Sequence, residues 1–418
     1  MLTESEISIY DFASALSGAV DLISPSLNGH HKRVAYIAGK IALEMNVSVE
    51  DTQDIILASM LHDIGAFSPI ERIRSEDPDA QENELEQHTM QGYKLLKGFE
   101  PLARAASLIR YHHADFFRAG SNVPLGSYII SIADKAAVLV DDKREILEQV
   151  PEVYEKITFK YHQFDPRTMS AFFQLAKYEY FMVEAFSPAY STIALKKMHY
   201  PKKIIDMDAL RDFAKVIAQI IDFRSRFTST HSSGVAAVAL ELATISGFSE
   251  RECRLMEIAG LLHDLGKLAV SNDILEKNGK LDSKEINFIK KHTYYTYAVL
   301  NKISGLEHIA TLAAYHHERP DGNGYPFHMK NSHFSKLARI MAVADIITAL
   351  TEDRPYRSGM SREQAGAVLQ SMASSGGIDR DIMELATKNF SRINEVRHIA
   401  QMEAKKEYEA FHSSGIRQ

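Results

Sequence analysis

The chain has 418 residues, of which 45% are hydrophobic and 25% charged, a composition typical of folded proteins that excludes a mostly disordered chain. The formal net charge of −7 shows no basic excess, so we expect no general binding to DNA, RNA or an anionic membrane. A single cysteine, Cys253, excludes an internal disulfide. The first residues form no signal peptide, and no stretch offers about 20 uninterrupted apolar residues, so we expect a cytoplasmic protein.

Apolar residues at helical spacing mark the predicted elements along the chain. The pattern i, i+3, i+4 runs over Val34–Met45 and recurs over Val235–Ala243. The runs Asp54–Leu61 and Cys253–Leu262 are predicted to be buried helices, and each ends on a His-Asp pair. No series of alternating strands separated by hairpin turns is recognisable. The predicted fold class is therefore all-α, with two helical bundles in tandem.

An imperfect internal repeat underlies this prediction. Matching residues lie 201 positions apart at first, and the offset grows slightly towards the end, as small insertions in a duplicated domain would produce. The repeated polar positions in the first half are His30, His62, Asp63, His88, His112, His113 and Asp134. Their counterparts in the second half are His231, His263, Asp264, His292, His316, His317 and Asp345. A break in the apolar pattern places the boundary near residues 190–205.

The repeated residues have the chemistry of metal ligands. Imidazole and carboxylate donors suit iron, manganese, zinc, cobalt or nickel. Seven donors in one half exceed what a single catalytic ion with open positions needs, so we predict at least two ions close enough to share a bridging water. A lone histidine is more often a surface or capping residue. We therefore interpret the histidines without a counterpart as ordinary: His31, His162, His199, His308, His328, His333, His398 and His412.

Groups suited to an anionic substrate lie near these ligands. Lys267 follows Asp264 by three residues, and Arg354 and Arg357 lie shortly after Asp345. Guanidinium groups suit bidentate phosphate contacts, although a solvated lysine and surface ion pairs are the simpler alternatives. The glycine- and proline-containing stretch His316–Pro326 is predicted to be a structured loop that shapes a substrate site, with a plain turn as the alternative.

Two motifs carry a resemblance to a known family. HDLGK and HHERPDGNGYP occur in the order found in HD-GYP domains, a branch of the HD metal-dependent phosphohydrolases, and the resemblance covers residues 205–390. It implies a helical bundle with a non-haem centre of two or three metal ions, often iron or manganese. It also implies hydrolysis of a cyclic dinucleotide, cyclic di-GMP or 3′3′-cyclic GMP-AMP, to the linear 5′-phosphorylated dinucleotide through a metal-bridging hydroxide.

The resemblance also implies roles for individual residues. One metal would be held by His231, His263, Asp264 and Asp345. The other would be held by His292, His316 and His317, with Asp264 bridging the two. Asp264 and Lys267 would be catalytic, and phosphate would be contacted by Lys267, Arg354 and Arg357. The loop beside base and ribose would comprise Asp321, Gly322, Gly324, Tyr325 and Pro326.

Two departures from the family pattern matter. Members with three metals have a glutamate four residues before the first ligand histidine, and Phe227 stands there. We therefore predict a dinuclear centre of iron or manganese. Many members carry an aspartate where this chain has Thr348, which leaves one substrate contact open. Two alternatives are an HD phosphohydrolase of another nucleotide and a cyclic-dinucleotide receptor without catalysis.

The first half resembles a diverged HD domain. It keeps the second candidate metal site, but HDIGA has Ala66 in place of the lysine, and YHHADFFRAG replaces the GYP loop. We predict a regulatory or dimerisation domain over residues 1–195, with a second active site as the alternative, a catalytic domain over 203–390 and a helical tail over 391–418. The tail is expected to pack on the domain, with a short coiled coil as the alternative. A homodimer and a signalling-protein partner both stay open.

Overall fold

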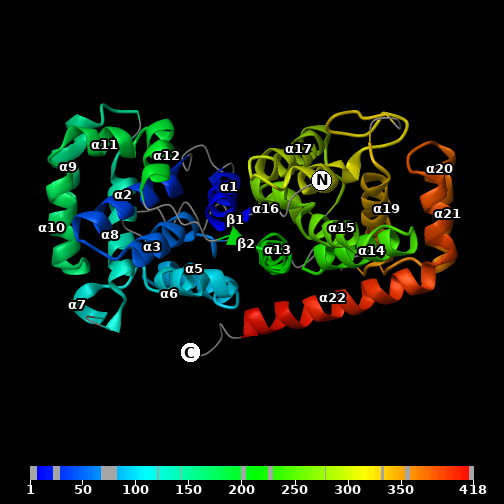
Figure 1. Ribbon diagram of the computed structural model, residues 1–418, viewed down its shortest axis with the longest axis horizontal. Helices are drawn as coiled ribbons and strands as arrows, with labels where there is room; N and C mark the ends of the chain where they lie inside the picture. Colours follow the sequence, from blue (N-terminus) through cyan, green and yellow to red (C-terminus); the bar gives the residue numbers. More distant parts are fainter. Residues whose placement is uncertain are drawn as a thin grey trace. The chain divides into compact units, whose positions relative to one another are not determined.

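The computed structural model divides into two compact units (Figure 1). One unit spans Ser8–Ile204, and the other contains the chain from Ile205 onward together with Ile7. The structure describes residues 7–21, 29–66, 82–119, 122–141, 143–198, 204–224, 229–277, 279–330, 334–353 and 358–413. Within these ranges, no helix is both long enough and apolar enough to cross a lipid bilayer.

The first unit is built from helices. Their bounds are α1 (Ile9–Asp21), α2 (His30–Glu44), α3 (Val49–Leu61), α5 (Glu82–Leu96), α6 (Ala103–Arg110), α7 (Phe116–Ala119), α8 (Leu125–Leu139), α9 (Val150–Phe159), α10 (Pro166–Leu175), α11 (Glu179–Ala185) and α12 (Pro188–Lys197). Helices α3 and α8 pack on α2 and bury its apolar face. The described residues also include short 3₁₀ turns at Glu100–Leu102, Leu147–Gln149 and Tyr161–Gln163.

The second unit repeats this arrangement. Its helices are α13 (Met207–Asp222), α14 (His231–Ile245), α15 (Glu250–Leu262), α16 (Asn272–Leu275), α17 (Ser283–Leu300), α18 (Glu307–Ala314), α19 (Lys336–Thr351), α20 (Arg362–Ser374), α21 (Arg380–Lys388) and α22 (Phe390–Ser413). The 3₁₀ turns η6 (Leu265–Ala269) and η7 (Tyr315–His317) follow α15 and α18. Helix α14 packs against α15, α19 and α22, so it takes the central place that α2 holds in the first unit.

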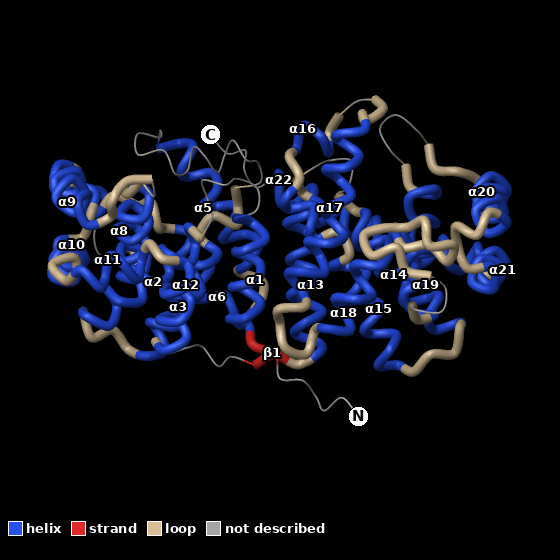
Figure 2. Tube along the Cα trace, turned by 90° about the horizontal axis from the view of Figure 1, so that it is seen from above, coloured by secondary structure: helices blue, strands red, loops and turns tan. Residues whose placement is uncertain are grey.

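Strands are confined to two short segments in the described residues. Strands β1 (Ile7–Ser8) and β2 (Ile204–Ile205) pair in a two-stranded sheet, drawn red in Figure 2. A single antiparallel bridge joins Asp321 and Lys330 inside a loop. The predicted all-α fold with two tandem bundles is confirmed.

The segment predicted as the domain boundary contains a helix. Helix α12 begins at Pro188, whose fixed φ and missing N–H suit the first helical position, and it ends at Lys197. It carries Lys196 and Lys197 in its last turn, where cations interact favourably with the helix dipole. Because α12 packs on α2, the first unit continues beyond the predicted limit of residue 195.

Helix caps set where the His-Asp pairs fall. Ser249 caps α15 and forms a capping box with Glu252, and Ser48 caps α3 by accepting a hydrogen bond from the backbone of Asp51. Both helices have 13 residues and both end at a leucine directly before the pair. Equal helix lengths therefore place the pair at the same buried helix end in both units.

The tail forms helix α22, which packs on α14 (Figure 1). Among its buried residues are Ile393 and Ala404, and two polar side chains, Arg397 and Gln401, are buried with them. Arg397 donates to Gln401 one turn later. The tail is thus an integral helix of the second unit.

Candidate metal centre

Three histidines of the second unit share one local geometry. Nδ1 of His263 lies 2.7 Å from the carbonyl oxygen of Gly260, and His292 and His316 make the same contact with the carbonyl three residues earlier, also at 2.7 Å. A ring nitrogen this close to a carbonyl must carry the proton. In a neutral ring this contact leaves Nε2 unprotonated and facing the other ligands, which is the form that binds a metal.

Helices α17 and η7 bring one ligand group together. His292, His316 and His317 offer ligand atoms within 4.8 Å of one another. Nε2 of His292 lies 3.1 Å from Nε2 of His316. The rings of His316 and His317 are 4.2 Å apart, because the two residues are adjacent in the 3₁₀ turn.

A second ligand group forms where α14, the end of α15 and α19 meet. His231, His263 and Asp264 offer ligand atoms within 4.8 Å of one another. Nε2 of His231 lies 3.2 Å from Oδ1 of Asp345 on α19. All four residues are at most 9% exposed. The structure thus brings together the residues predicted for the first metal.

Asp264 faces both groups. Its Oδ2 lies 3.2 Å from Nε2 of His263, and its Oδ1 lies 3.4 Å from Nε2 of His292. Each oxygen therefore points to a different ligand group. This is the arrangement expected of a carboxylate that bridges two ions.

The arrangement of nitrogens fits a bound cation. Nδ1 of His292 and of His316 donates to the backbone, and burial lowers the pKa of His292 to about 3 and that of His316 well below its usual value. Both rings are then neutral, and two lone pairs face each other across 3.1 Å. Nitrogens bound at about 2.1 Å to one ion and about 90–110° apart lie about 3.0–3.4 Å from each other. A divalent ion would remove this repulsion.

The charge balance keeps the carboxylates ionised. Burial opposes ionisation of Asp264, but the neighbouring His263 and Lys267 outweigh it and hold the pKa of this carboxyl well below its usual range. Burial likewise opposes ionisation of Asp345, and the hydrogen bond and charge of His231 lower its pKa in spite of it. Both acids are therefore present as the anions that metals bind.

Lys267 lies in η6, directly after the ligand pair. Its Nζ donates to Oδ2 of Asp264 at 2.5 Å, and 22% of the side chain is exposed. The backbone around it is held by buried Arg224, which donates to the carbonyl oxygens of Lys267 and Val270 at 2.8 Å and to Oδ1 of Asn272 at 2.8 Å. Sequence reasoning missed Arg224, because its partners lie more than 40 residues away.

Close packing explains why the HDLGK motif has glycine at position 266. A Cβ at this position would lie 1.9 Å from the carbonyl oxygen of His292. The equivalent Gly65 is equally restricted, with 2.2 Å to the carbonyl oxygen of His88. Thr296 completes the junction by accepting from the N–H of Gly266 at 2.9 Å and donating to the carbonyl of His263 at 3.0 Å. Close backbone contact thus fixes the helix of one ligand group against that of the other.

Glu352 contacts the candidate ligand His231 on the ring nitrogen that faces away from the metal site. Its Oε2 lies 3.0 Å from Nδ1 of His231, and Gln401 of α22 donates to the same oxygen at 3.2 Å. A carboxylate on the far nitrogen fixes the ring and raises its basicity. Sequence reasoning missed Glu352, although it follows Asp345 by only two helical turns.

The GYP loop, the predicted stretch His316–Pro326, is anchored by buried Glu318. The two carboxylate oxygens of Glu318 accept from the N–H groups of Phe327 and Met329 at 2.6 and 2.8 Å. Gly324 is required, since a Cβ there would lie 2.4 Å from the backbone nitrogen of Arg319. The peptide bond between Tyr325 and Pro326 is cis.

Tyr325, which is predicted to contact substrate, packs against the candidate metal ligand His317. Its ring lies 4.9 Å from that of His317. Asp321 is instead bonded within the fold: it accepts from Arg319 at 2.6 Å, and its N–H donates to the carbonyl of Gly376 at 3.2 Å. Gly322 has a φ of 81°, which glycine adopts without strain.

Three predictions fall on residues that the structure leaves undescribed. Phe227, Arg354 and Arg357 lie outside the described ranges. Thr348 is buried and donates to the carbonyl oxygen of Ala344 at 2.8 Å, so it is bonded to its own helix.

The first unit retains both ligand groups. One contains His88, His112 and His113, and the other contains His30, His62 and Asp134. Oδ1 of Asp63 lies 3.3 Å from Nε2 of His88, and its Oδ2 lies 3.3 Å from Nε2 of His62, so Asp63 faces both groups as Asp264 does. Nε2 of His113 is buried and makes no hydrogen bond with the described residues, which again fits a bound cation.

His31 does not fit its interpretation as an ordinary histidine. It is 2% exposed and shares a third ligand group with His62 and Asp63. The sequence signal failed here because the repeat places Ser232 at the corresponding position, so His31 has no counterpart.

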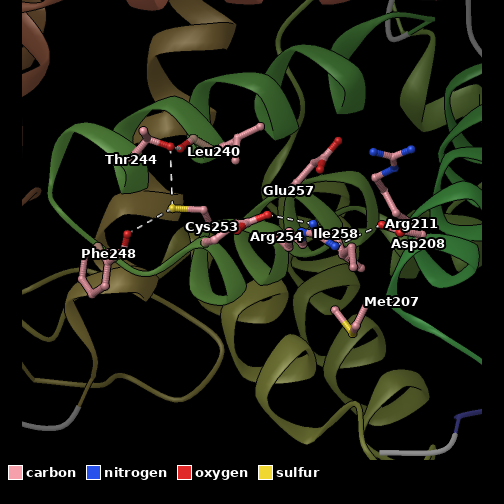
Figure 3. A pocket seen from close by; sticks show the side chains of 11 residues that line it. Met207, Asp208, Arg211, Leu240, Thr244, Phe248, Cys253, Arg254, Glu257 and Ile258 are labelled. Atoms are coloured by element: carbon pink, nitrogen blue, oxygen red, sulfur yellow. Dashed lines mark hydrogen bonds and ion pairs between the residues drawn. The ribbon is translucent and has the colours of Figure 1, made fainter. Parts of the chain in front are cut away.

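A separate hollow of about 470 Å³ is lined by residues of α13, α14 and α15 (Figure 3). Its lining includes Asp208, Arg254 and Cys253 but none of the predicted ligands. Arg254 bridges Asp208 and Glu250 at 3.2 and 2.8 Å, and Cys253 contacts Thr244 at 3.6 Å. These internal contacts account for Asp208, Arg254 and Cys253 among the polar side chains of the hollow.

Comparison with known proteins identifies the family. HD-domain profiles match residues 28–139 and residues 215–382. The chain belongs to the HD-domain family, with one HD domain in each half. HD domains are metal-dependent, in agreement with the ligand groups.

Individual relatives match to different extents. A 3′3′-cGAMP-specific phosphodiesterase 1 of Vibrio cholerae is 27% identical over 90% of both chains. A cyclic di-GMP phosphodiesterase response regulator of Xanthomonas campestris is 37% identical over 38% of this chain and 43% of its own length. A solved structure of a cyclic GMP-AMP-specific phosphodiesterase of V. cholerae has the same fold, with a TM-score of 0.65, 23% identity and coverage of 92% of this chain and 98% of that chain.

Proposed function

We propose that the second half is a metal-dependent phosphodiesterase that hydrolyses a cyclic dinucleotide. The observation that carries this proposal is the pair of ligand groups joined by Asp264, with Lys267 beside them and the GYP loop continuing directly from His317. Phosphodiesterases of cyclic dinucleotides among the relatives of this HD-domain chain support it.

The residues of the chain define the chemistry. Asp264 would hold two ions, His231, His263 and Asp345 the first, and the three histidines of α17 and η7 the second. When bound, divalent iron or manganese ions supply Lewis acidity and lower the pKa of a bound water towards neutrality. The neutral Nε2 atoms of His292 and His316 and the ionised carboxylates need no proton loss before they bind. Burial lowers the pKa of His231, but Glu352 and Asp345 outweigh it and raise that pKa well above its usual value, so this ring would lose a proton when it binds a metal.

Lys267 would neutralise charge on the phosphoryl oxygens of the substrate. Its ammonium is held by Asp264, yet part of the side chain is exposed, so it can face a phosphate from the open side. Hydrolysis adds one water: a bond from oxygen to phosphorus forms, the bond to the ribose 3′ oxygen breaks, and that oxygen takes a proton. The product is a linear dinucleotide with a 5′ phosphate.

We propose 3′3′-cyclic GMP-AMP as the preferred substrate. The relative whose match spans 90% of this chain is named for that compound, whereas the cyclic di-GMP relative matches 38% of it. Cyclic di-GMP is the competing substrate, and the ratio of the two kcat/KM values decides between them.

The deciding experiment is anaerobic turnover with Mn²⁺ or Fe²⁺, in which the products of both cyclic dinucleotides are separated by chromatography. We expect a linear dinucleotide from the wild-type chain and a loss of at least 1,000-fold in the variant His263→Ala/Asp264→Ala, by analogy with the ~10²–10⁴-fold worth of single catalytic groups. The exposed His398→Ala serves as the matched control. Binding without hydrolysis in metal-loaded protein would favour the receptor alternative, and retained turnover in the double variant would sink the proposed site.

A further inference from the structure

The first unit contains a buried histidine where the second unit has a serine. His31 follows His30 at the start of α2, and Ser232 stands at the equivalent place in α14. Nδ1 of His31 lies 2.6 Å from Oδ1 of Asp21, and the other oxygen of Asp21 accepts from the N–H of Gly29 at 3.1 Å. These two contacts fix Asp21. Because Asp21 occupies Nδ1 of His31, Nε2 is the nitrogen that can bind a metal ion.

His31 adds a donor to one ligand group. Ligand atoms of His31, His62 and Asp63 lie within 4.8 Å of one another, and the His31 ring is 5.2 Å from that of His62 and 5.4 Å from that of His30. Nε2 of His62 lies 3.4 Å from Nε2 of His30 and 3.5 Å from Oδ1 of Asp134. Five side chains therefore converge here, and four occupy the equivalent place in the second unit.

The equivalent aspartates Asp21 and Asp222 have different partners in the two units. In the second unit, Asp222 accepts from the N–H and the hydroxyl of Ser232 at 3.0 and 2.9 Å, so it fixes the start of α14. In the first unit, Asp21 forms a carboxylate–histidine pair with His31. Such a pair orients metal-binding imidazoles and sets which nitrogen faces the metal.

We propose that the first unit binds a divalent metal ion at His30, His62, Asp63 and Asp134, and that His31 is a fifth protein ligand which closes this ion to water and substrate. Structural metal sites are filled by protein ligands, whereas catalytic sites keep an open position. The absence of a lysine agrees with a structural role, because Ala66 replaces it. The proposal concerns metal binding by the first unit and does not depend on the reaction proposed for the second.

The experiment uses the full-length chain with His263→Ala and His292→Ala, which disable both ligand groups of the second unit. In this parent, His31→Ser introduces the residue of the second unit, and exposed His162→Ser is the matched control. Bound Co²⁺ is counted by elemental analysis, and its affinity is measured by competition with a chromogenic chelator. We expect His31→Ser to weaken binding of one Co²⁺ at least tenfold and the control to leave it unchanged; loss of an outer-shell partner alone costs about 10–100-fold.

Closure of the site has its own readout. Removal of His31 opens a coordination position, so azide should change the visible Co²⁺ spectrum more in His31→Ser than in the parent. His31→Gln keeps a side chain of similar length that can still donate to Asp21, and it replaces the serine variant if that variant does not fold. Equal Co²⁺ affinity in His31→Ser and His162→Ser, or a parent that binds no Co²⁺, would overturn the proposal. An equal azide response would overturn the closed character of the site.

Discussion

At the scale of single residues, Glu352 is the group whose contribution the structure reveals most directly. It is 5% exposed, and its Oε2 contacts both His231 and Gln401. The substitution Glu352→Gln keeps the shape but removes the charge that orients the imidazole. We expect metal affinity of the second unit to fall about 10–100-fold.

The measurement is competition for Mn²⁺ with a fluorescent chelator. Exposed Glu403→Gln on α22 is the matched control, since it removes an equal charge from the helix that carries Gln401. If both variants bind Mn²⁺ as tightly as the wild-type chain does, Glu352 contributes nothing to metal binding through His231.

Gly266 allows a second residue-scale prediction, based on shape alone. The substitution Gly266→Ala would place a methyl group 1.9 Å from a backbone oxygen of α17, so the backbone must move. We expect the free energy of unfolding to fall by about 2 kcal/mol or more, as for other overpacked cores. Gly366→Ala is the control, because nothing lies within 4 Å of its Cβ position in α20. This substitution should raise the free energy of unfolding by about 0.5–1 kcal/mol. Urea unfolding of the second unit compares the two, and equal midpoints would refute the steric argument.

At the scale of elements, the tail helix α22 is part of the second unit. It buries apolar residues on α14, which begins at the ligand His231, and it supplies Gln401 to the contact behind that ligand. A chain that ends at Asn389 should therefore expose the α14 face, melt at a lower temperature and bind Mn²⁺ more weakly in the second unit. A chain that ends at Ser413 should match the full-length protein. Melting followed by circular dichroism tests both, and equal melting of the two chains would show that α22 is dispensable.

What the sequence predicts at this scale depends on how local each signal is. The clustering of the candidate ligands was predictable because the His-Asp pair, the adjacent histidines and the repeat place them in short patterns. Arg224 and Glu352 were not, because their roles arise from contacts with residues 43 and 121 positions away. The helix α12 was missed for a different reason. Its proline and two lysines resemble a linker, but they stand in the first and last turns, where a helix accepts them.

At the scale of the whole molecule, the repeat predicts two equal folds but hides how the two units differ. A comparison by offset finds residues that both units keep, and it passes over a residue that only one unit has. His31 is such a residue, and its burial beside His62 is visible only in three dimensions. The lysine and the GYP loop are the opposite case: their loss from the first half is plain in the sequence, and it predicts that chemistry belongs to the second.

This division of labour can be measured in the intact chain. The substitutions His62→Ala/Asp63→Ala and His263→Ala/Asp264→Ala remove the same pair from each unit, so they disturb equivalent buried helix ends. Because only the second unit has Lys267 next to its pair, we expect the first double variant to lower kcat/KM for the cyclic dinucleotide less than tenfold and the second to lower it at least 1,000-fold. Equal losses would mean that both centres take part in turnover. The metal content of each variant is measured as well, to distinguish loss of a bound metal from unfolding. A variant that keeps the metal of its unchanged unit has kept that unit folded.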